Sequence, residues 1–287
     1  MIVTRFAPSP TGYLHLGHAY AAITAHDTAR ESGGCFLLRI EDIDASRCRP
    51  EFARAIHEDL AWLGLEWTEP ALRQSERFEA YRSALSRLQD QGLLYPCFCT
   101  RAEIAYEIAR AAEAPHGPEG PVYPGTCRNL NDGEGKRRIG AGAPFAMRLD
   151  VQRASATAGQ LSFQELGGAP VGEVGHVAVH PLLFGDIVVA RKETPASYHL
   201  SVVVDDAFQG VTRVTRGNDL FSATHVQRLL QAVLGLPEPE YAHHRLVLDS
   251  NGKKLSKRDR ALTLRSLRES GVTPQEIRER ILAPSRN

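Results

Sequence analysis

Residues 2–30, IVTRFAPSPTGYLHLGHAYAAITAHDTAR, decide the fold, because they predict a strand, a turn and a helix in succession. Ile2–Phe6 is β-prone, and the prolines and glycine that follow cannot continue a strand. Ala19–Arg30 has the composition of a good helix. A second short apolar strand follows at Cys35–Ile40 and ends in an acidic run. This order of elements is typical of a parallel sheet.

Segments further along the chain continue the alternation of helices and strands. We expect helices at about 51–63, 76–91, 197–208 and 223–234, and strands at 211–215 and 245–248. A polar loop and two short helices are expected to finish the chain. The predicted fold class is therefore α/β, with a doubly wound parallel sheet.

The middle of the chain differs in texture. Glycine and proline are dense between positions 115 and 125, and short alternating segments occur at 145–149 and 161–165. We interpret this region as an inserted, partly β module. The expected organisation is two halves of one sheet domain at 1–95 and 191–248, an insertion at 96–190, and a loop with short helices at 249–287.

Composition excludes several classes of protein. Of 287 residues, 43% are hydrophobic and 24% charged, as in ordinary globular proteins, and no apolar run approaches the roughly 18 residues that cross a bilayer. The amino terminus lacks the pattern of a secretory signal, so we expect a cytoplasmic location. Lys plus Arg (34) equals Asp plus Glu (34), so net charge gives no hint of a polyanionic partner. Five cysteines, an odd number, argue against a disulfide framework.

The motif His15-Leu16-Gly17-His18 lies where the first turn meets the first predicted helix. A nucleoside triphosphate there would meet unpaired backbone N–H groups and the positive end of a helix dipole. The two histidines add hydrogen-bond donors, and Gly17 leaves room for the nucleotide to approach the backbone. Alone, the motif is weak, because four such residues recur by chance.

The motif Lys254-Leu255-Ser256-Lys257-Arg258 lies in a polar loop that follows a predicted strand. Lys254 and Lys257, separated by the small hydroxyl residue Ser256, suit the neutralisation of charge on a transferring phosphoryl group. A loop can close over ATP after it binds. A solvated basic loop is the alternative for the pentapeptide alone, but the histidine motif upstream strengthens the functional interpretation.

Several motifs together resemble one family. Arg5–Gly12 running into the histidine motif is similar to the opening of glutamyl-tRNA synthetases, which are class I aminoacyl-tRNA synthetases. The resemblance covers residues 2 to about 265, and its further motifs follow in the same order: Arg39–Asp42, Asp205-Asp206, Gly210–Thr212, Arg216-Gly217 and the lysine motif. It implies a Rossmann-like catalytic domain that uses Mg-ATP, with His15, Gly17, His18, Ser256 and Lys257 binding ATP and His15, His18, Lys254 and Lys257 in catalytic roles.

An amino-acid pocket follows from both chemistry and resemblance. A γ-carboxylate favours a fixed guanidinium, and Arg5 and Arg216 each end a predicted parallel strand, where such sheets bind ligands. Glu41 suits the α-ammonium group, and Tyr198 and Ser9 could add contacts. The resemblance assigns glutamate binding to Arg5, Phe6, Ala7, Pro8, Ser9, Glu41, Tyr198 and Arg216.

Three cysteines in the insertion suggest a metal. Cys97, Cys99 and Cys127 offer soft ligands, and such spacing in a cytosolic protein favours structural zinc over a disulfide. Chemistry alone prefers His116 as the fourth ligand, whereas the resemblance favours Tyr123, which we take. Three reduced cysteines without metal remain the alternative.

Full glutamyl-tRNA synthetases continue beyond the lysine motif into a helical anticodon-binding region, whereas this sequence has 29 residues after Arg258. It thus resembles a short branch of the family that makes glutamyl-AMP without tRNA and transfers glutamate to queuosine, the wobble base of tRNA(Asp). We expect ATP, L-glutamate and queuosine-containing tRNA(Asp) as partners, no membrane, and a monomer. The alternatives are a minimal glutamyl- or glutaminyl-tRNA synthetase that charges an acceptor end, and a non-catalytic paralogue that binds tRNA or glutamate.

Overall fold

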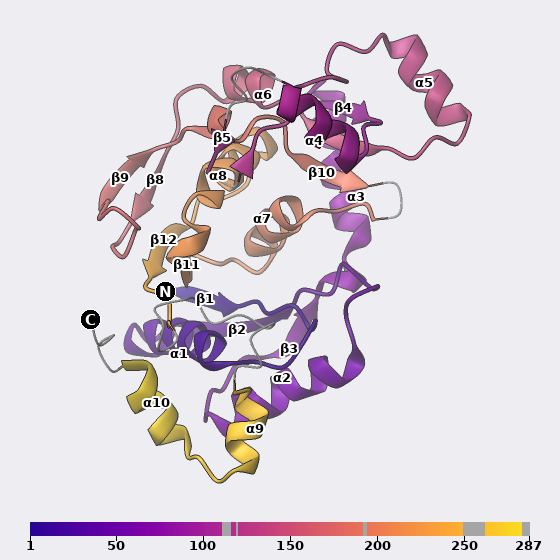
Figure 1. The fold of residues 1–287 in the computed structure, drawn as a ribbon. Helices are drawn as coiled ribbons and strands as arrows, with labels where there is room; N and C mark the ends of the chain where they lie inside the picture. Colours follow the sequence, from indigo (N-terminus) through magenta and orange to yellow (C-terminus); the bar gives the residue numbers. More distant parts are fainter. Residues whose placement is uncertain (111–115, 119, 192–193, 249–261, 283–287) are drawn as a thin grey trace.

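The computed structural model describes residues 1–110, 116–118, 120–191, 194–248 and 262–282 (Figure 1). The strands are β1 (Val3–Phe6), β2 (Cys35–Ile40), β3 (Thr68–Arg73), β4 (Leu94–Cys97), β5 (His116–Gly117), β6 (Gly120–Pro121), β7 (Ala146–Leu149), β8 (Ser162–Glu165), β9 (Gly175–Ala178), β10 (Val188–Arg191), β11 (Arg213–Gly217) and β12 (Glu240–His244). The α-helices are α1 (Leu16–Glu31), α2 (Pro50–Trp62), α3 (Phe78–Asp90), α4 (Arg101–Arg110), α5 (Asp132–Gly140), α6 (Val151–Ala158), α7 (Tyr198–Phe208), α8 (Ala223–Leu234), α9 (Leu264–Glu269) and α10 (Pro274–Leu282), with short 3-10 turns at 74–76, 181–184 and 218–220.

Two groups of parallel strands meet at the centre of the molecule. One has the order β1-β2-β3, and the other has the order β11-β12-β8-β9, in which only β9 runs antiparallel to its neighbour. The backbone N–H of Thr212 donates to the carbonyl of Val3 at 3.0 Å, so β11 follows directly beside β1. Strand order therefore reverses between β1 and β11, the place where doubly wound sheets bind ligands. The predicted α/β class with a parallel sheet is confirmed.

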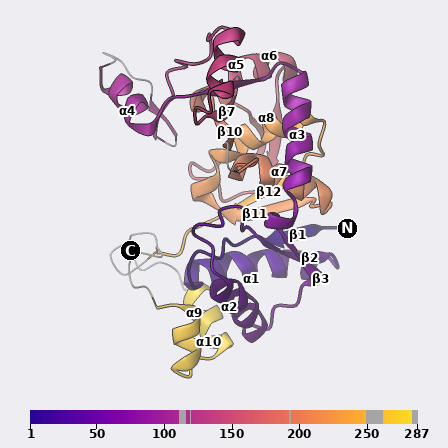
Figure 2. The ribbon, with the colours of Figure 1, turned by 90° about the vertical axis from the view of Figure 1, so that its right-hand side faces the viewer.

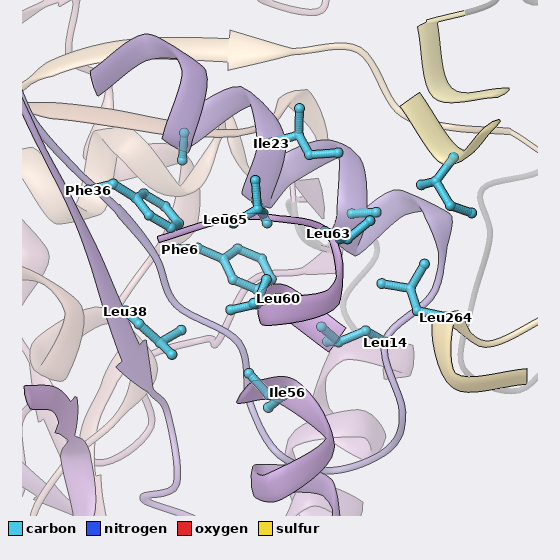
Figure 3. Close-up of a cluster of buried hydrophobic side chains, with 14 of the residues drawn as sticks. Phe6, Leu14, Ile23, Phe36, Leu38, Ile56, Leu60, Leu63, Leu65 and Leu264 are labelled. Carbon is cyan, nitrogen blue, oxygen red and sulfur yellow. The ribbon is translucent and has the colours of Figure 1, made fainter. Parts of the chain in front are cut away.

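Helices cover both faces of this sheet. On one face, α1 and α2 bury an apolar cluster that includes Phe6, Phe36 and Ile56 (Figure 3). Leu264 of α9 and Ile281 of α10 join the same cluster, so the short C-terminal helices complete the core beneath α1 and α2 (Figures 1 and 3). On the other face, α3, α6, α7 and α8 enclose a second cluster.

A second, antiparallel sheet of order β10-β7-β4 lies beyond α7 and α8. Helices α4 and α5 project from that end of the molecule, far from α9 and α10 (Figures 1 and 2). Strands β8 and β9 lie within the segment 96–190 in sequence, yet both belong to the central sheet, because β8 pairs with β12 and β9 pairs with β8.

Several strands differ from the sequence prediction, and two of the differences, at β12 and β3, have a clear physical reason. The strand expected at 245–248 lies instead at Glu240–His244, because the buried His243 is matched by Glu165 and does not interrupt the sheet. Strand β3 was missed because Thr68–Arg73 contains Pro70 and polar residues. Its position at the edge of the sheet explains how proline is accommodated.

Candidate active site and metal centre

Arg5 lies at the switch point, at the carboxyl end of β1. Its Nε donates to Oδ1 of Asp206 at 3.0 Å, and its Nη1 donates to the carbonyl of Thr215 at 3.2 Å. Arg39 of β2 donates from Nη2 to the same oxygen of Asp206 at 2.8 Å. Two buried guanidinium groups thus share one buried carboxylate of α7, and their charges hold its pKa below the ordinary value even though burial alone would raise it. Asp206 therefore fixes Arg5 in place.

Glu41 follows β2 and faces the same cluster. Its Oε1 lies 3.7 Å from Nε of Arg39, and its backbone N–H donates to the carbonyl of Pro8 at 3.0 Å, which joins the loops after β1 and β2. Burial raises the pKa of Glu41 to about 7, against the lowering effect of Arg39 and Arg5. A carboxyl group that titrates near neutral pH in a ligand-binding edge is typical of a functional site.

Arg216 ends β11 and is also buried, but its partners differ from those of Arg5. Nε donates to Nε2 of His243 at 3.2 Å, Nη1 to Oε1 of Gln227 at 2.7 Å, and Nη2 to Oγ1 of Thr224 at 2.6 Å. All three acceptors within the described residues are uncharged. A buried guanidinium without a direct carboxylate partner is electrostatically prepared to bind an anion.

The other residues expected at the amino-acid pocket lie nearby in the fold. Phe6 belongs to the hydrophobic core, so only its backbone can face a ligand (Figure 3). Ala7 and Ser9 are half-buried and Pro8 is buried in the loop after β1. Tyr198 is the first residue of α7, the helix that carries Asp206. The structure thus brings the loop after β1, Glu41, Arg216 and the helix of Tyr198 to one edge of the sheet.

The histidine motif forms the amino end of α1. His15 is the N-cap; its Nδ1 accepts from the N–H of Gly17 at 3.1 Å, and its own N–H donates to Nδ1 of His18 at 3.2 Å. Because each Nδ1 accepts a hydrogen bond, each neutral ring carries its proton on Nε2. The ring centroids lie 3.8 Å apart. Two imidazole donors are therefore fixed at a helix amino terminus, an arrangement suited to phosphate.

Lys254, Ser256 and Lys257 lie outside the described residues. The described chain resumes at residue 262, beside the histidine motif. Thr263 forms a β-bridge with His15, and Leu264 donates its N–H to the carbonyl of Leu14 at 2.8 Å. The segment that contains the lysine motif is thus followed directly by residues held against the histidine motif.

The three cysteines of the insertion converge. Their Sγ atoms lie within 4.8 Å of one another, with Cys99 and Cys127 3.5 Å apart. The Oη of Tyr123 lies 3.3 Å from the sulfur of Cys97 and 3.7 Å from that of Cys99. A tetrahedral zinc with normal bond lengths places its sulfur ligands about 3.8 Å apart and a sulfur and an oxygen about 3.6 Å apart. The four side chains therefore fit a tetrahedral metal.

The protonation of Cys99 and Tyr123 depends on whether a cation is bound. Burial raises the pKa of the Cys99 thiol to about 12 and raises the pKa of Tyr123 as well, so without a cation both groups keep their protons. The backbone N–H of Cys127 donates to Oη of Tyr123 at 2.9 Å, and the guanidinium carbon of Arg148 lies 3.7 Å from the centre of the Tyr123 ring. Both contacts would stabilise a phenolate ligand. The side chain of His116, the alternative ligand, lies outside the described residues.

Some contributors at the switch point escaped sequence reasoning. Arg39 and Asp206 stand in motifs that the resemblance matched, but the sequence did not predict that Arg5 and Arg39 both donate to Asp206. Thr224 and Gln227 gave no signal, because polar residues in an amphipathic helix are ordinary. His243 and its partner Glu165 are 78 residues apart in sequence.

Comparisons with known proteins agree with this geometry. Residues 1–283 match the family model for the catalytic domain of class I tRNA synthetases (E and Q). A glutamyl-Q tRNA(Asp) synthetase of Rhodobacter capsulatus is 50% identical over 98% of this chain and 99% of its own length. A glutamate–tRNA ligase of Aquifex aeolicus is 41% identical over 96% of this chain, which spans 55% of that enzyme.

Solved structures of glutamate-tRNA synthetases are also similar to this chain. A glutamate-tRNA synthetase of Elizabethkingia anophelis superposes with a TM-score of 0.75 at 29% identity, covering 90% of this chain and 53% of that one. The chain belongs to the catalytic-domain family of class I tRNA synthetases for glutamate and glutamine, within which it is similar over its whole length to the glutamyl-Q tRNA(Asp) synthetases. The resemblance drawn from the sequence motifs, including the assignment to ligases, is confirmed.

Within the described part of the chain, no helix combines the length and the apolar character that crossing a bilayer requires.

Proposed function

We propose that this protein activates L-glutamate with ATP, without tRNA, and transfers the glutamyl group to the queuosine base of tRNA(Asp). The observation that carries the first step is Arg216. Its buried guanidinium meets only uncharged acceptors among the described residues, at the ligand-binding edge of a sheet in a tRNA synthetase family. Such a group favours the γ-carboxylate of glutamate over a neutral side chain.

In this proposal the substrate lies between the two ends of the sheet. Arg216 binds the γ-carboxylate, and the ionised Glu41 binds the α-ammonium group. Arg5, held by Asp206, and the loop of Phe6, Ala7, Pro8 and Ser9 line the pocket, and Tyr198 adds a hydroxyl contact. The set proposed for glutamate is Arg5, Phe6, Ala7, Pro8, Ser9, Glu41, Tyr198 and Arg216.

The nucleotide lies at the amino end of α1. The Nε2–H groups of His15 and His18 donate to phosphate oxygens of Mg-ATP beside Gly17. An α-carboxylate oxygen of glutamate attacks the α-phosphorus of ATP. The bond between the α-phosphorus and the oxygen that bridges to the β-phosphate breaks, and diphosphate leaves with the negative charge that develops on this oxygen. Lys254 and Lys257, with Ser256, stabilise that charge. The acceptor hydroxyl then attacks the glutamyl carbonyl and AMP leaves.

Formation of the adenylate without tRNA is supported by the way the pocket is held. Arg5, Arg39 and Arg216 are all fixed by side chains of this chain, so no partner is needed to position them. Preorganised groups of this kind need no reorganisation when charge develops.

The metal proposed for the insertion is a single structural zinc bound by Cys97, Cys99, Tyr123 and Cys127. When bound, it supplies a cross-link between the end of β4 and residues 123–127. A filled set of four protein ligands suits a structural rather than a catalytic site. The domain bounds 1–95, 96–190, 191–248 and 249–287, a cytoplasmic location and a monomeric state stay predictions.

The acceptor is proposed from the relatives. Three similar proteins, at 50%, 43% and 44% identity, bear the name glutamyl-Q tRNA(Asp) synthetase. The glutamate–tRNA ligases, the alternative within the same chemistry, match with lower coverage of their own length.

Two assays test the proposal. Pyrophosphate exchange with ATP and glutamate should proceed in the absence of tRNA. Radiolabelled glutamate should then pass to queuosine-containing tRNA(Asp), but not to queuosine-free tRNA(Asp) or to tRNA(Glu). Exchange that needs tRNA would refute the first step, and labelling of the queuosine-free tRNAs would favour a minimal tRNA ligase. Absence of exchange under every condition would favour a binding paralogue.

A further inference from the structure

Arg216 is held by a buried chain of polar residues that extends away from the proposed glutamate pocket. Nε2 of His243 accepts from Nε of Arg216, and Nδ1 of His243 lies 2.6 Å from Oε2 of Glu165. His243 is 4% exposed and Glu165 is fully buried. The three residues come from β11, β12 and β8, three adjacent strands of the central sheet.

Proton positions in this chain follow from Arg216. A guanidinium Nε can only donate, so Nε2 of His243 must be an acceptor and the imidazole proton must lie on Nδ1. The Nδ1–H then donates to the carboxylate of Glu165. Burial and the neighbouring Arg216 both lower the pKa of His243, against Glu165, which agrees with a neutral ring.

Glu165 is fixed more firmly than a single hydrogen bond would allow. Its Oε1 accepts from the backbone N–H of His243 and from the backbone N–H of Gly167, each at 3.1 Å. The backbone also leaves little room to move: a Cβ added at Gly168 would lie 1.9 Å from the carbonyl oxygen of His243. The carboxylate is therefore locked against β12, and it sets the tautomer of His243.

The consequence falls on the guanidinium of Arg216. Among the described residues, three of its five N–H groups are bonded to His243, Gln227 and Thr224, all uncharged, and one N–H on each terminal nitrogen has no partner there. Two parallel N–H groups match the two oxygens of a carboxylate. A carboxylate in the place of His243 would neutralise Arg216 directly, whereas a neutral imidazole fixes its orientation and leaves its charge for the ligand.

We propose that His243 and Glu165 are positioning residues that determine the specificity of Arg216 for an anionic side chain. His243 orients the guanidinium through an uncharged contact, and Glu165 holds His243 in the tautomer that makes this contact. The inference rests on the proposed role of Arg216 in glutamate binding.

The test compares three substitutions in the full-length protein. His243→Phe keeps the ring size but removes the acceptor, and His243→Gln offers an amide oxygen close to the place of Nε2. His176→Phe is the matched control, because His176 is exposed on β9 of the same sheet. Pyrophosphate exchange gives KM for glutamate, KM for ATP and kcat, glutamine is assayed as a competing substrate, and thermal unfolding reports stability.

We expect His243→Phe to raise KM for glutamate by about 10-fold or more, the scale of one hydrogen bond to a charged group, with KM for ATP changed much less. Discrimination between glutamate and glutamine should fall by a similar factor. His243→Gln should recover most of the lost affinity, and His176→Phe should behave as wild type. Glu165→Gln should also raise KM for glutamate, because its amide group can reverse the tautomer of His243.

Two results would overturn the inference while leaving the proposed function intact. One is an active His243→Phe enzyme with unchanged KM for glutamate. The other is an equal loss for glutamate and ATP in both His243 variants together with a lower melting temperature, which would show a merely structural role. If the wild-type protein shows no glutamate-dependent exchange at all, the proposed function itself fails and the inference fails with it.

Discussion

Substitution of Glu41 by glutamine should stabilise the protein and impair it at the same time. The carboxyl group has a pKa of about 7 in the fold, above its ordinary 4.5, because burial outweighs its attraction to Arg39 and Arg5. The folded state therefore binds this proton more tightly than the unfolded state. Between pH 4.5 and pH 7 stability falls as pH rises, and the penalty is complete above pH 7 and absent below pH 4.5.

The size of the effect follows from the shift. At pH 8 the buried, ionised Glu41 costs about 3 kcal/mol of unfolding free energy, and at pH 5 about 1 kcal/mol. These values already include the attraction of the two arginines. Glutamine has nearly the same volume and carries no charge at either pH, so Glu41→Gln should gain roughly these amounts relative to wild type.

Urea denaturation of both proteins at pH 5 and pH 8 measures the gain directly, with Glu66→Gln as a control at an exposed position. Activity should change in the opposite direction. Wild-type KM for glutamate should rise below pH 7 by up to about tenfold per pH unit, because the α-ammonium group needs the ionised carboxylate. In Glu41→Gln that pH dependence should disappear and KM should be high throughout. An equal stability difference at both pH values, or a flat wild-type profile from pH 6 to pH 8, would refute this reasoning.

Three further perturbations have expected outcomes. Lys257→Ala should reduce kcat for pyrophosphate exchange by about 10²-fold or more with little change in glutamate affinity; unchanged turnover would contradict its assignment to the transition state. Asp206→Asn leaves two buried guanidinium groups without their carboxylate, so it should lower the unfolding free energy measured in urea by about 3–5 kcal/mol. Glu240→Gln is the control, because it removes one partner of the half-exposed pair with Arg213 and should cost under about 1 kcal/mol. Protein purified without chelator should hold about one zinc by metal analysis, strongly reduced in Cys99→Ser and reduced in Tyr123→Phe; full zinc retention in Tyr123→Phe would exclude the phenol oxygen.

Apolar periodicity and breaker residues predicted the helices and strands whose bounds depend on neighbouring residues in the chain. The helix 223–234 was predicted with the bounds that the structure shows, because an apolar stripe precedes Gly235, which adopts the left-handed conformation at its end. Cys35–Ile40 was likewise a short apolar run between breakers. The predicted strands likewise placed Arg5 and Arg216 at strand ends, and the structure brings the ends of these two strands, β1 and β11, together.

The missed features depend on partners distant in sequence. His243 and His244 precede the strand expected at 245–248, yet they are the end of β12, since a carboxylate 78 positions earlier compensates the buried imidazole of His243. Likewise, Asp206 can fix Arg5 and Arg39 only because α7 packs across β1 and β2, which carry these two arginines. Contacts between residues so far apart in the chain leave no local pattern in a single sequence.

The two halves of the molecule are stabilised in different ways, and this gives the metal its physical role. The central sheet packs a large apolar cluster that includes Phe6, Phe36 and many leucines, and the antiparallel sheet shares a second large cluster with α3, α7 and α8. The cluster around the cysteines is small: its buried members are Tyr95, Cys97, Tyr123 and Cys127, with Phe98, Cys99, Ile104 and Leu130 at its margin. Three of the four buried side chains are proposed ligands, and Cys99 is the fourth ligand, so polar atoms of the site take up much of the interior of this cluster. Without a cation, the three sulfur atoms and the phenol oxygen would be linked only by weak mutual hydrogen bonds. A bound cation would cross-link the same atoms by coordination, so its removal should loosen the insertion while the central sheet stays folded.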